Sequence, residues 1–263
     1  MTLYSTNTDI CPYCKGGGYI IKRKSTAHSK KVYGDDRLLD YAEPCPYCNG
    51  GFEHKAEEVK QRATIPDSYL NNLLGDFDWD IYVDAKGNKI DVSKQKEFIT
   101  SFIDDFEKWS DVPLGLYINS KTRGSGKTFL ASCICNEIIK KYACVTKFVS
   151  AIDLIDISKG DNDPLKPLKE CRLLVLDDVG AKLNGQEWLN DILFSIIDYR
   201  YQHKLTMIIT SNIPLKRLKI DDRLDSRIDK MTQNIPLPEC SVRQLKANQD
   251  KLKLFKNLNL IKT

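Results

Sequence analysis

The chain has 263 residues, of which 41% are hydrophobic and 29% charged, and its formal net charge is +4. This length predicts one or two domains, and the composition is that of a globular protein, which excludes collagen-like, mucin-like and wholly disordered classes. No apolar run reaches the roughly 20 residues that cross a bilayer, and the first residues, MTLYSTNTDICPYCK, lack the order of a signal peptide. We therefore expect a cytoplasmic protein without a membrane partner.

Two near-copies of one short phrase lie near the N-terminus, CPYCKGGGY at 11–19 and CPYCNGGF at 45–52. They place Cys11, Cys14, Cys45 and Cys48 in two CxxC pairs. Two residues between thiols let both sulfurs face one ion, so four thiolates would complete a tetrahedral Zn²⁺ site. The polar stretch between the pairs cannot build a core of its own, and metal binding would supply the missing folding free energy. We expect residues 1–60 to form a zinc-binding domain and residues 61–263 to form a second domain.

A redox function of the CxxC pairs is the alternative, and His28 or His54 is an alternative metal ligand. The duplication and the flanking glycines favour a site of four cysteines. The other five cysteines lie in apolar segments, where we expect them to be small core residues.

Beyond the N-terminal region, the hydrophobic pattern predicts alternating helices and strands. A helical connector is expected over 56–62, and apolar residues at helical spacing predict an amphipathic helix over 92–109. Strands are expected at 114–120, 146–151, 172–178, 205–212 and 232–237. Helices are expected at 129–142, at 187–202, around RLDSRI, and from about Ser241. This alternation predicts an α/β fold with a parallel sheet flanked by helices.

Residues 121–128, KTRGSGKT, follow an expected strand and begin an expected helix, which is the context of a phosphate-binding loop. Backbone N–H groups of such a loop point inward around phosphate oxygens, and the helix N-terminus adds partial positive charge. The lysine would bridge the β and γ phosphates of ATP, and the threonine hydroxyl would ligate Mg²⁺. The expected nucleotide-binding residues are Thr122, Arg123, Gly124, Ser125, Gly126, Lys127 and Thr128.

One position departs from the full pattern, because Lys121 stands where a glycine is expected six residues before Lys127. Glycine at that position serves the tight turn that leaves the strand. We expect the loop to adopt a changed geometry there or to turn the Lys121 side chain to solvent. Nucleotide binding should survive with a shifted affinity, since the inner glycines, the lysine and the hydroxyl are present.

Polar residues at the ends of two further strands complete the expected site. The apolar strand RLLVLDD ends in Asp177 and Asp178, which predicts one carboxylate on the Mg²⁺ side and one that polarises the attacking water. We expect Asp177 in the first function and Asp178 in the second. The sequence TSN closes the next strand, where Asn212 would lie beside the γ-phosphate and orient the water.

Taken in order, IPDSYLNN, KTRGSGKT, LLVLDDVG, TSN, RLDSRI and SVRQ resemble the AAA+ ATPases. Within them, the chain is similar to the DnaC/DnaI-type replicative helicase loaders and to the related IstB-type transposition ATPases. The resemblance covers about residues 60–250 and implies an AAA+ P-loop core that hydrolyses ATP.

The resemblance also implies functions for individual residues. The arginine of a segment like DSRI reaches the neighbouring subunit's site in this family, which implies Arg227, with Arg223 as the alternative; intrahelical salt bridges to nearby aspartates are the structural alternative for both. The second sensor arginine would be Arg243. Most AAA+ hydrolases have Asp-Glu where this chain has Asp-Asp, so Asp178 is one methylene shorter and slow hydrolysis is expected.

The first functional hypothesis is an ATP-dependent loader that opens a hexameric replicative helicase around single-stranded DNA. Some loaders of this kind carry an N-terminal zinc-bearing domain that grips the helicase, and their AAA+ domains assemble into an ATP-dependent oligomer. The alternatives are an IstB-like regulator of transposition or recombination that coats DNA, and a zinc-stapled nucleic-acid-binding module. Residues 213–263 carry 12 Lys and Arg against 6 Asp and Glu, which makes this segment a candidate DNA contact.

Overall fold

The computed structural model describes residues 19–24, 39–44, 52–112, 114–160, 162–180, 187–218, 222–247 and 251. The chain divides into two units, Met1–Val59 and Lys60–Thr263. In the first unit, β1 (Tyr19–Lys24) pairs antiparallel with β2 (Leu39–Pro44). Helix α2 (Phe52–Arg62) follows and ends in the second unit. The four cysteines of the expected zinc site, Cys11, Cys14, Cys45 and Cys48, lie outside the described residues, so the zinc site stays a prediction.

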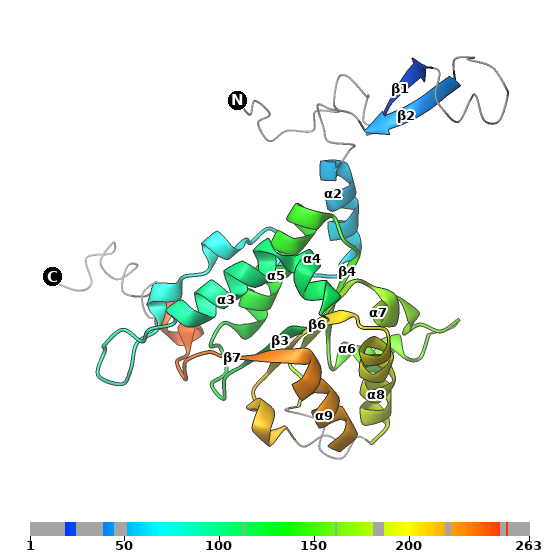
Figure 1. Cartoon of the computed structure of the whole chain (residues 1–263). Helices are drawn as coiled ribbons and strands as arrows, with labels where there is room; N and C mark the ends of the chain where they lie inside the picture. Colours follow the sequence, from blue (N-terminus) through cyan, green and yellow to red (C-terminus); the bar gives the residue numbers. More distant parts are fainter. Residues whose placement is uncertain are drawn as a thin grey trace, which may run out of the picture. The chain divides into compact units, whose positions relative to one another are not determined.

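The second unit is built on a five-stranded parallel sheet (Figure 1). Its strands are β3 (Gly115–Asn119), β4 (Thr146–Ser150), β5 (Leu173–Asp177), β6 (Thr206–Ser211) and β7 (Thr232–Pro236). Their order is β4-β5-β6-β3-β7, and every described pairing within it is parallel. Strands β3, β5 and β6 are buried along their whole length, as expected of a parallel sheet covered on both faces. The expected parallel α/β sheet is therefore confirmed.

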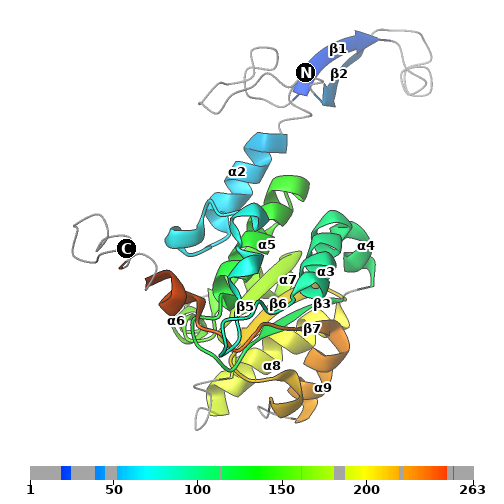
Figure 2. The ribbon, with the colours of Figure 1, turned by 90° about the vertical axis from the view of Figure 1, so that its left-hand side faces the viewer.

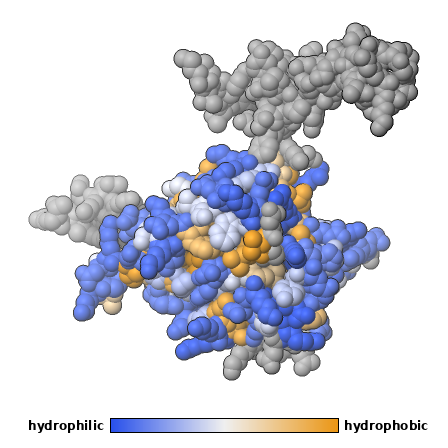
Figure 3. Space-filling model, in the orientation of Figure 1, coloured by the Kyte–Doolittle hydropathy of each residue, from blue (hydrophilic) through white to orange (hydrophobic). Residues whose placement is uncertain are grey.

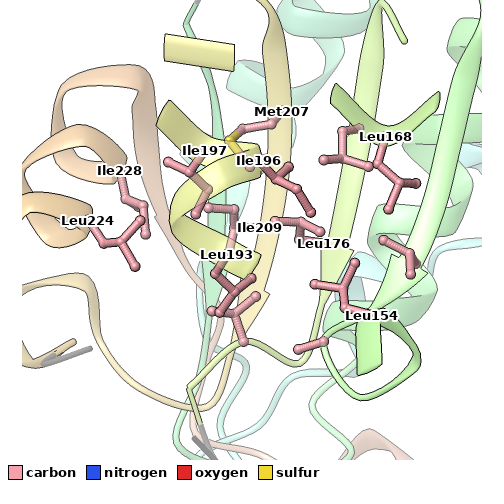
Figure 4. Close-up of a cluster of buried hydrophobic side chains, with 14 of the residues drawn as sticks. Leu154, Leu168, Leu176, Leu193, Ile196, Ile197, Met207, Ile209, Leu224 and Ile228 are labelled. Carbon is pink, nitrogen blue, oxygen red and sulfur yellow. The ribbon is translucent and has the colours of Figure 1, made fainter. Parts of the chain in front are cut away.

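Helices cover both faces of this sheet (Figures 1 and 2). One face carries α5 (Lys127–Tyr142), with α3 (Ser93–Asp104) and α4 (Phe106–Asp111) beyond it. The other face carries α6 (Asp153–Ile157), α7 (Lys166–Glu170), α8 (Glu187–Gln202) and α9 (Asp222–Met231). Figure 4 shows Leu193, Ile196 and Ile197 of α8 packed against Leu176 and Ile209 of the sheet, all of them buried.

The strand order determines where the two halves of the sheet diverge. From β3 the chain crosses through α5 to the edge strand β4, whereas β7 is added on the other side of β3. In open α/β sheets, ligands bind beyond the carboxyl ends of the strands at such a switch point. Residues 120–126, which join β3 to α5, lie at this point.

The expected helix over 92–109 is instead two helices. Asp105 leaves the helical conformation with φ −113° and ψ 28°, and α4 begins at Phe106. The indole N–H of Trp109 donates to the Ser101 carbonyl oxygen at 3.2 Å, and the Trp109 ring contacts the Phe98 ring, so α4 packs against α3. The Phe102 and Phe106 rings meet edge to face at this bend, so the apolar residues share one buried cluster although the helix is broken.

Several short elements were not expected from the sequence. They are α6, α7 and the 3₁₀ turns η2 (Leu74–Asp76), η3 (Trp79–Ile81) and η4 (Leu215–Arg217); a further 3₁₀ turn, η1 (Asp67–Tyr69), follows Pro66, which favours a turn or a helix start. Each is one turn or little more, too short for a periodic pattern to predict. Among the described helices, none has the length and apolar character needed to span a membrane. Figure 3 shows mostly hydrophilic residues on one face of the second unit, with smaller hydrophobic patches between them.

Candidate nucleotide-binding site

The phosphate loop, residues 121–128, joins the carboxyl end of β3 to the first turn of α5. Gly124 and Gly126 have φ of +77° and +97°, in the left-handed region that favours glycine. A Cβ on Gly124 would meet the Arg243 Cβ at 3.0 Å, and one on Gly126 would meet the Phe77 ring at 3.3 Å. Both glycines are therefore required by their backbone conformation and by close packing. The loop opens directly into α5 at Lys127, so the helix N-terminus faces it.

Lys127 is buried inside the loop, with only 7% of the residue's surface exposed. Its Nζ donates to the carbonyl oxygens of Ser120 and Thr122 at 3.2 and 3.1 Å and to the Ser125 hydroxyl at 3.2 Å. Burial lowers the pKa of Lys127, and the carboxylates of Asp178, Glu239 and Asp177 offset part of this effect. A buried cation held only by neutral oxygen atoms favours the arrival of an anion.

The hydroxyl of Thr128 lies against the carboxylate of Asp177 at the end of β5. It donates at 3.0 and 3.1 Å to the two carboxylate oxygens, and the Thr210 hydroxyl donates to Oδ1 at 2.6 Å. Burial raises the pKa of Asp177, and the hydrogen bonds from Thr210 and Thr128 counteract part of the rise. A hydroxyl and a carboxylate are oxygen ligands of the kind that Mg²⁺ takes in nucleotide sites.

The next acid faces a different neighbour. Asp178 has φ +57°, so the chain leaves β5 through a left-handed residue and the Asp178 side chain turns outward, where it is exposed. Its backbone N–H donates to the Thr210 hydroxyl at 2.9 Å, and its Oδ1 accepts from Asn212 Nδ2 at 2.8 Å. Asp178 and Asn212 therefore form one polar pair beyond the ends of β5 and β6, and their water-orienting function stays a prediction.

Arg243 contacts the phosphate loop at Gly124. Its backbone N–H donates to the Gly124 carbonyl oxygen at 3.1 Å, and its Cβ and Nε lie 3.0 and 3.8 Å from the position of a Cβ on Gly124. The structure thus brings Arg243 to the loop although 119 positions separate it from Gly124. Arg123, the residue before Gly124, is exposed.

Arg227 is placed apart from these residues. Its guanidinium donates from Nε to Asp198 Oδ1 at 2.7 Å and pairs with the same oxygen through Nη2 at 2.7 Å. It also lies over the rings of Phe194 and Tyr201, 5.1 and 5.7 Å from their centroids. These partners belong to α8, so within its own chain Arg227 is an α8–α9 contact, and a function in a neighbouring site stays a prediction.

Three residues of the site were not singled out from the sequence. Tyr82 is fully buried and donates its hydroxyl to the Ser125 carbonyl oxygen at 2.8 Å. Thr210 holds both acids of β5, and Glu239 accepts hydrogen bonds from the first residues of the loop. Thr210 could have been found because it begins the TSN motif, whereas no spacing in the sequence links Tyr82 or Glu239 to the loop.

A family model described as IstB-like ATP binding protein matches residues 117–232. The match begins in β3 and ends at β7, and it includes the phosphate loop, both acids and Asn212. The core of the second unit is an IstB/DnaC-like AAA+ domain.

Similarity to individual proteins extends beyond residues 117–232. The uncharacterized protein YqaM of Bacillus subtilis (strain 168) is 24% identical over 260 residues, which cover 85% of this chain and 80% of YqaM. The replicative helicase loader DnaC of Escherichia coli (strain K12) is 22% identical over 221 residues, covering 79% of this chain and 86% of DnaC. The crystal structure of DnaI matches with a TM-score of 0.54 and 25% identity, covering 67% of this chain and 96% of that structure.

The residues of the AAA+ domain fit the nucleotide and ion of an ATP-binding family. The phosphate loop supplies glycines in the required conformation and a buried lysine, and Thr128 with Asp177 supplies two oxygen ligands. In the part of the chain that the structure describes, no group of three or more His, Cys, Asp or Glu side chains is placed to hold a metal ion. In nucleotide sites, Mg²⁺ is usually held by one or two protein ligands together with nucleotide phosphates.

Proposed function

We propose that this protein is an ATP-dependent loader that places a hexameric replicative helicase on single-stranded DNA during replication initiation. The main support for this proposal is the similarity to DnaC, which covers 79% of this chain and therefore extends beyond the ATP-binding core at residues 117–232. Site geometry supports the ATP requirement, because residues from β3, β5, β6 and the segment after β7 converge on one loop.

In this proposal, the residues of Thr122–Thr128 bind the phosphates of ATP. Their backbone N–H groups and the Lys127 ammonium face the anion, with the α5 N-terminus adding partial positive charge. Thr128 and Asp177 would hold Mg²⁺, which when bound supplies charge neutralisation for the phosphates. Asp178 accepts a proton from the attacking water, and Asn212 keeps the Asp178 carboxylate in place through its 2.8 Å hydrogen bond.

In this proposal, ATP binding controls the assembly of the oligomer, and repeated cycles of hydrolysis are less important. Arg227 on α9 would reach the nucleotide site of the next subunit, and Arg243 would report the nucleotide in its own site. The zinc-binding domain expected over residues 1–60 would grip the helicase, while the AAA+ domains form an ATP-dependent oligomer and contact single-stranded DNA. Slow hydrolysis follows from the short Asp178 side chain.

The family match supports a second candidate function. The model that matches residues 117–232 is described as IstB-like, so an ATPase that assembles on DNA and regulates transposition or recombination is the competing proposal. The two proposals share the ATP site and differ in the partner, because only the loader needs a helicase.

The experiment that separates them mixes the purified full chain with the replicative helicase of its host, with and without ATP, and measures the mass of the co-eluting species. The loader proposal expects a defined complex with the helicase hexamer that is lost when residues 1–60 are removed. ATP-dependent assembly on DNA with no helicase complex would refute the loader and favour the IstB-like function.

A further inference from the structure

The Glu239 carboxylate is surrounded by donors from the start of the phosphate loop. Oε1 accepts from the Lys121 backbone N–H at 3.0 Å. Oε2 accepts from the Thr122 backbone N–H at 2.8 Å, from the Thr122 hydroxyl at 2.9 Å and from the Ser120 hydroxyl at 3.2 Å. One side chain from beyond β7 thus binds three consecutive residues where the loop leaves β3.

These hydrogen bonds lie at the position where the loop departs from its usual sequence. A glycine would be expected at Lys121, whose side chain is exposed in the structure. Glu239 holds the backbone N–H groups of Lys121 and Thr122 in fixed directions through charge-assisted hydrogen bonds. The tight turn is therefore fixed by an external carboxylate and does not depend on glycine at this position.

The rest of the segment 237–243, here termed the sensor segment, follows the same loop. The Leu237 backbone N–H donates to the Asn119 carbonyl oxygen at 2.7 Å, and the Ser120 hydroxyl donates to the Pro238 carbonyl oxygen at 3.3 Å. Arg243 then reaches Gly124 through its backbone N–H. Glu239 lies between these contacts, so its hydrogen bonds determine the register of Arg243 against the loop.

Glu239 accepts these hydrogen bonds as a negatively charged carboxylate. Partial burial acts to raise the pKa of Glu239, but the hydrogen bonds from Lys121, Thr122 and Ser120 outweigh it and hold that pKa below its ordinary value. Glu239 is therefore a carboxylate at neutral pH. Its negative charge also helps to keep the buried Lys127 protonated.

We infer that Glu239 is a positioning residue for nucleotide binding, which fixes the first turn of the phosphate loop in place of the missing glycine and holds the sensor segment, with Arg243, against that loop. This inference rests on the proposed ATP site and deepens it. Glu239 acts through Lys121, Thr122 and Arg243.

Two substitutions separate the hydrogen bonds of Glu239 from its charge. In Glu239→Gln, the amide oxygen can occupy the place of Oε2 and keep three of the four donors, while the charge is lost. In Glu239→Ala all four donors lose their acceptor. Glu97, an exposed glutamate of α3, provides the matched control Glu97→Ala.

The test titrates each full-length variant with ATP carrying a fluorescent methylanthraniloyl group in the presence of Mg²⁺. We expect Glu239→Ala to raise Kd by about tenfold, equivalent to roughly 1.4 kcal/mol, whereas Glu239→Gln stays within about threefold of the unaltered chain and Glu97→Ala is unchanged. Because Glu239 is at the surface, the thermal midpoint without nucleotide should change by no more than about 2 °C.

Either of two results would overturn the inference. One is a Glu239→Ala variant that binds as tightly as Glu97→Ala, and the other is a Glu239→Gln variant as weak as Glu239→Ala, which would show that the three hydrogen bonds kept by glutamine do not position the loop. Lys127→Ala in the same titration tests the proposed ATP site separately. If Lys127→Ala binds ATP normally, the site itself is wrong; if only Glu239→Ala does, the positioning function alone fails.

Discussion

The Thr128 hydroxyl donates to both carboxylate oxygens of Asp177, at 3.0 and 3.1 Å, and so joins the first turn of α5 to the end of β5. The two residues are 49 positions apart and come from different layers of the fold. Asp177 is held a second time by Thr210 from the neighbouring strand β6. Two hydroxyls thus fix the carboxylate expected on the Mg²⁺ side in a single orientation.

Asp177→Asn should remove Mg²⁺-dependent hydrolysis and still leave the fold intact. Asp177 Oδ1 accepts from both Thr128 and Thr210, so the amide oxygen of asparagine can accept the same two hydrogen bonds. The raised pKa of Asp177 means that the buried charge disfavours folding at neutral pH, and removing it should raise the thermal midpoint by about 2–4 °C. We expect the rate of ATP hydrolysis to fall by about 100-fold or more.

The matched control for this prediction is Asp156→Asn on α6, an exposed aspartate that pairs with Lys159 at 2.9 Å. It should change neither quantity, as expected for a surface ion pair. A hydrolysis rate in Asp177→Asn equal to that of Asp156→Asn would remove Asp177 from the site.

Asp178→Asn should separate nucleotide binding from turnover. Asparagine at this position still accepts the hydrogen bond from Asn212, but it can no longer take a proton from water. We expect kcat to fall by about 100-fold with the Kd for ATP within about threefold. Single-turnover hydrolysis and equilibrium binding, measured on the same preparation, give the two values. Unchanged turnover would show that another group activates the water.

The strands and long helices of the AAA+ domain could be predicted from the sequence because they are long and strongly patterned. The β5 sequence LLVLD is buried throughout, and it was recognisable as a buried strand from its unbroken apolar run. By contrast, the break at Asp105 accompanies a hydrogen bond from the Trp109 indole N–H to the Ser101 carbonyl oxygen, which the helical spacing of apolar residues does not indicate.

The buried hydrogen bonds of polar side chains could not be predicted from the sequence either. Arg200 is fully buried in α8 and donates to carbonyl oxygens of Leu168, Cys171 and Thr206, among others, so it joins α7 to the sheet. Its sequence neighbourhood predicts only one more residue of an amphipathic helix. Burial of an arginine is decided by which carbonyl oxygens the fold leaves available, and that is a property of the assembled structure.

The residues of the candidate site also fall into two groups, those that the sequence could predict and those that it could not. The motif residues Lys127, Thr128 and Asp177 were predictable because their chemistry needs those residue types at that spacing. Glu239 and Tyr82 were not, because they contact backbone groups of the loop, and any acceptor or donor at the right place in the fold could do so.

ATP binding should take up a proton at alkaline pH through Lys127. Burial lowers the pKa of this ammonium in the free protein, and the phosphates of a bound nucleotide would raise it. Since the bound-state pKa is the higher one, affinity should fall as the pH rises through the free-state pKa. Calorimetric titrations with ATP in buffers of different ionisation enthalpy, from about pH 8 to about pH 10, measure this uptake. Binding without proton uptake over that range would contradict the prediction.

Cys45→Ser should release the metal expected from the duplicated CxxC phrase. One lost thiolate leaves three ligands and an open position, which weakens a structural Zn²⁺ site severely. We expect about one zinc per chain in the unaltered protein and much less in Cys45→Ser, measured by atomic emission after gel filtration. Cys240→Ser, which changes a partly exposed cysteine near the phosphate loop, is the control and should keep its zinc. A full zinc complement in Cys45→Ser would show that the ligand set is wrong.

Arg227 offers the sharpest test of assembly, because its ion pair with Asp198 gives it a function within its own chain as well. Arg227→Ala should lower the thermal midpoint by about 2–4 °C through the lost α8–α9 contact. If Arg227 also acts across subunits, this variant keeps its ATP affinity, but its rate of assembly-dependent ATP hydrolysis falls by about tenfold or more.

Mixing two variants distinguishes these functions. Lys127→Ala retains Arg227 but should not bind ATP, whereas Arg227→Ala retains the ATP site but lacks the arginine. In a mixed oligomer, an intact ATP site of one chain lies beside an intact Arg227 of the other, so the mixture should hydrolyse ATP faster than either variant alone. Asp198→Asn, which weakens the internal pair and keeps the arginine, should remain active alone. A mixture that stays inactive, although the two variants co-assemble, would restrict Arg227 to its contact with Asp198.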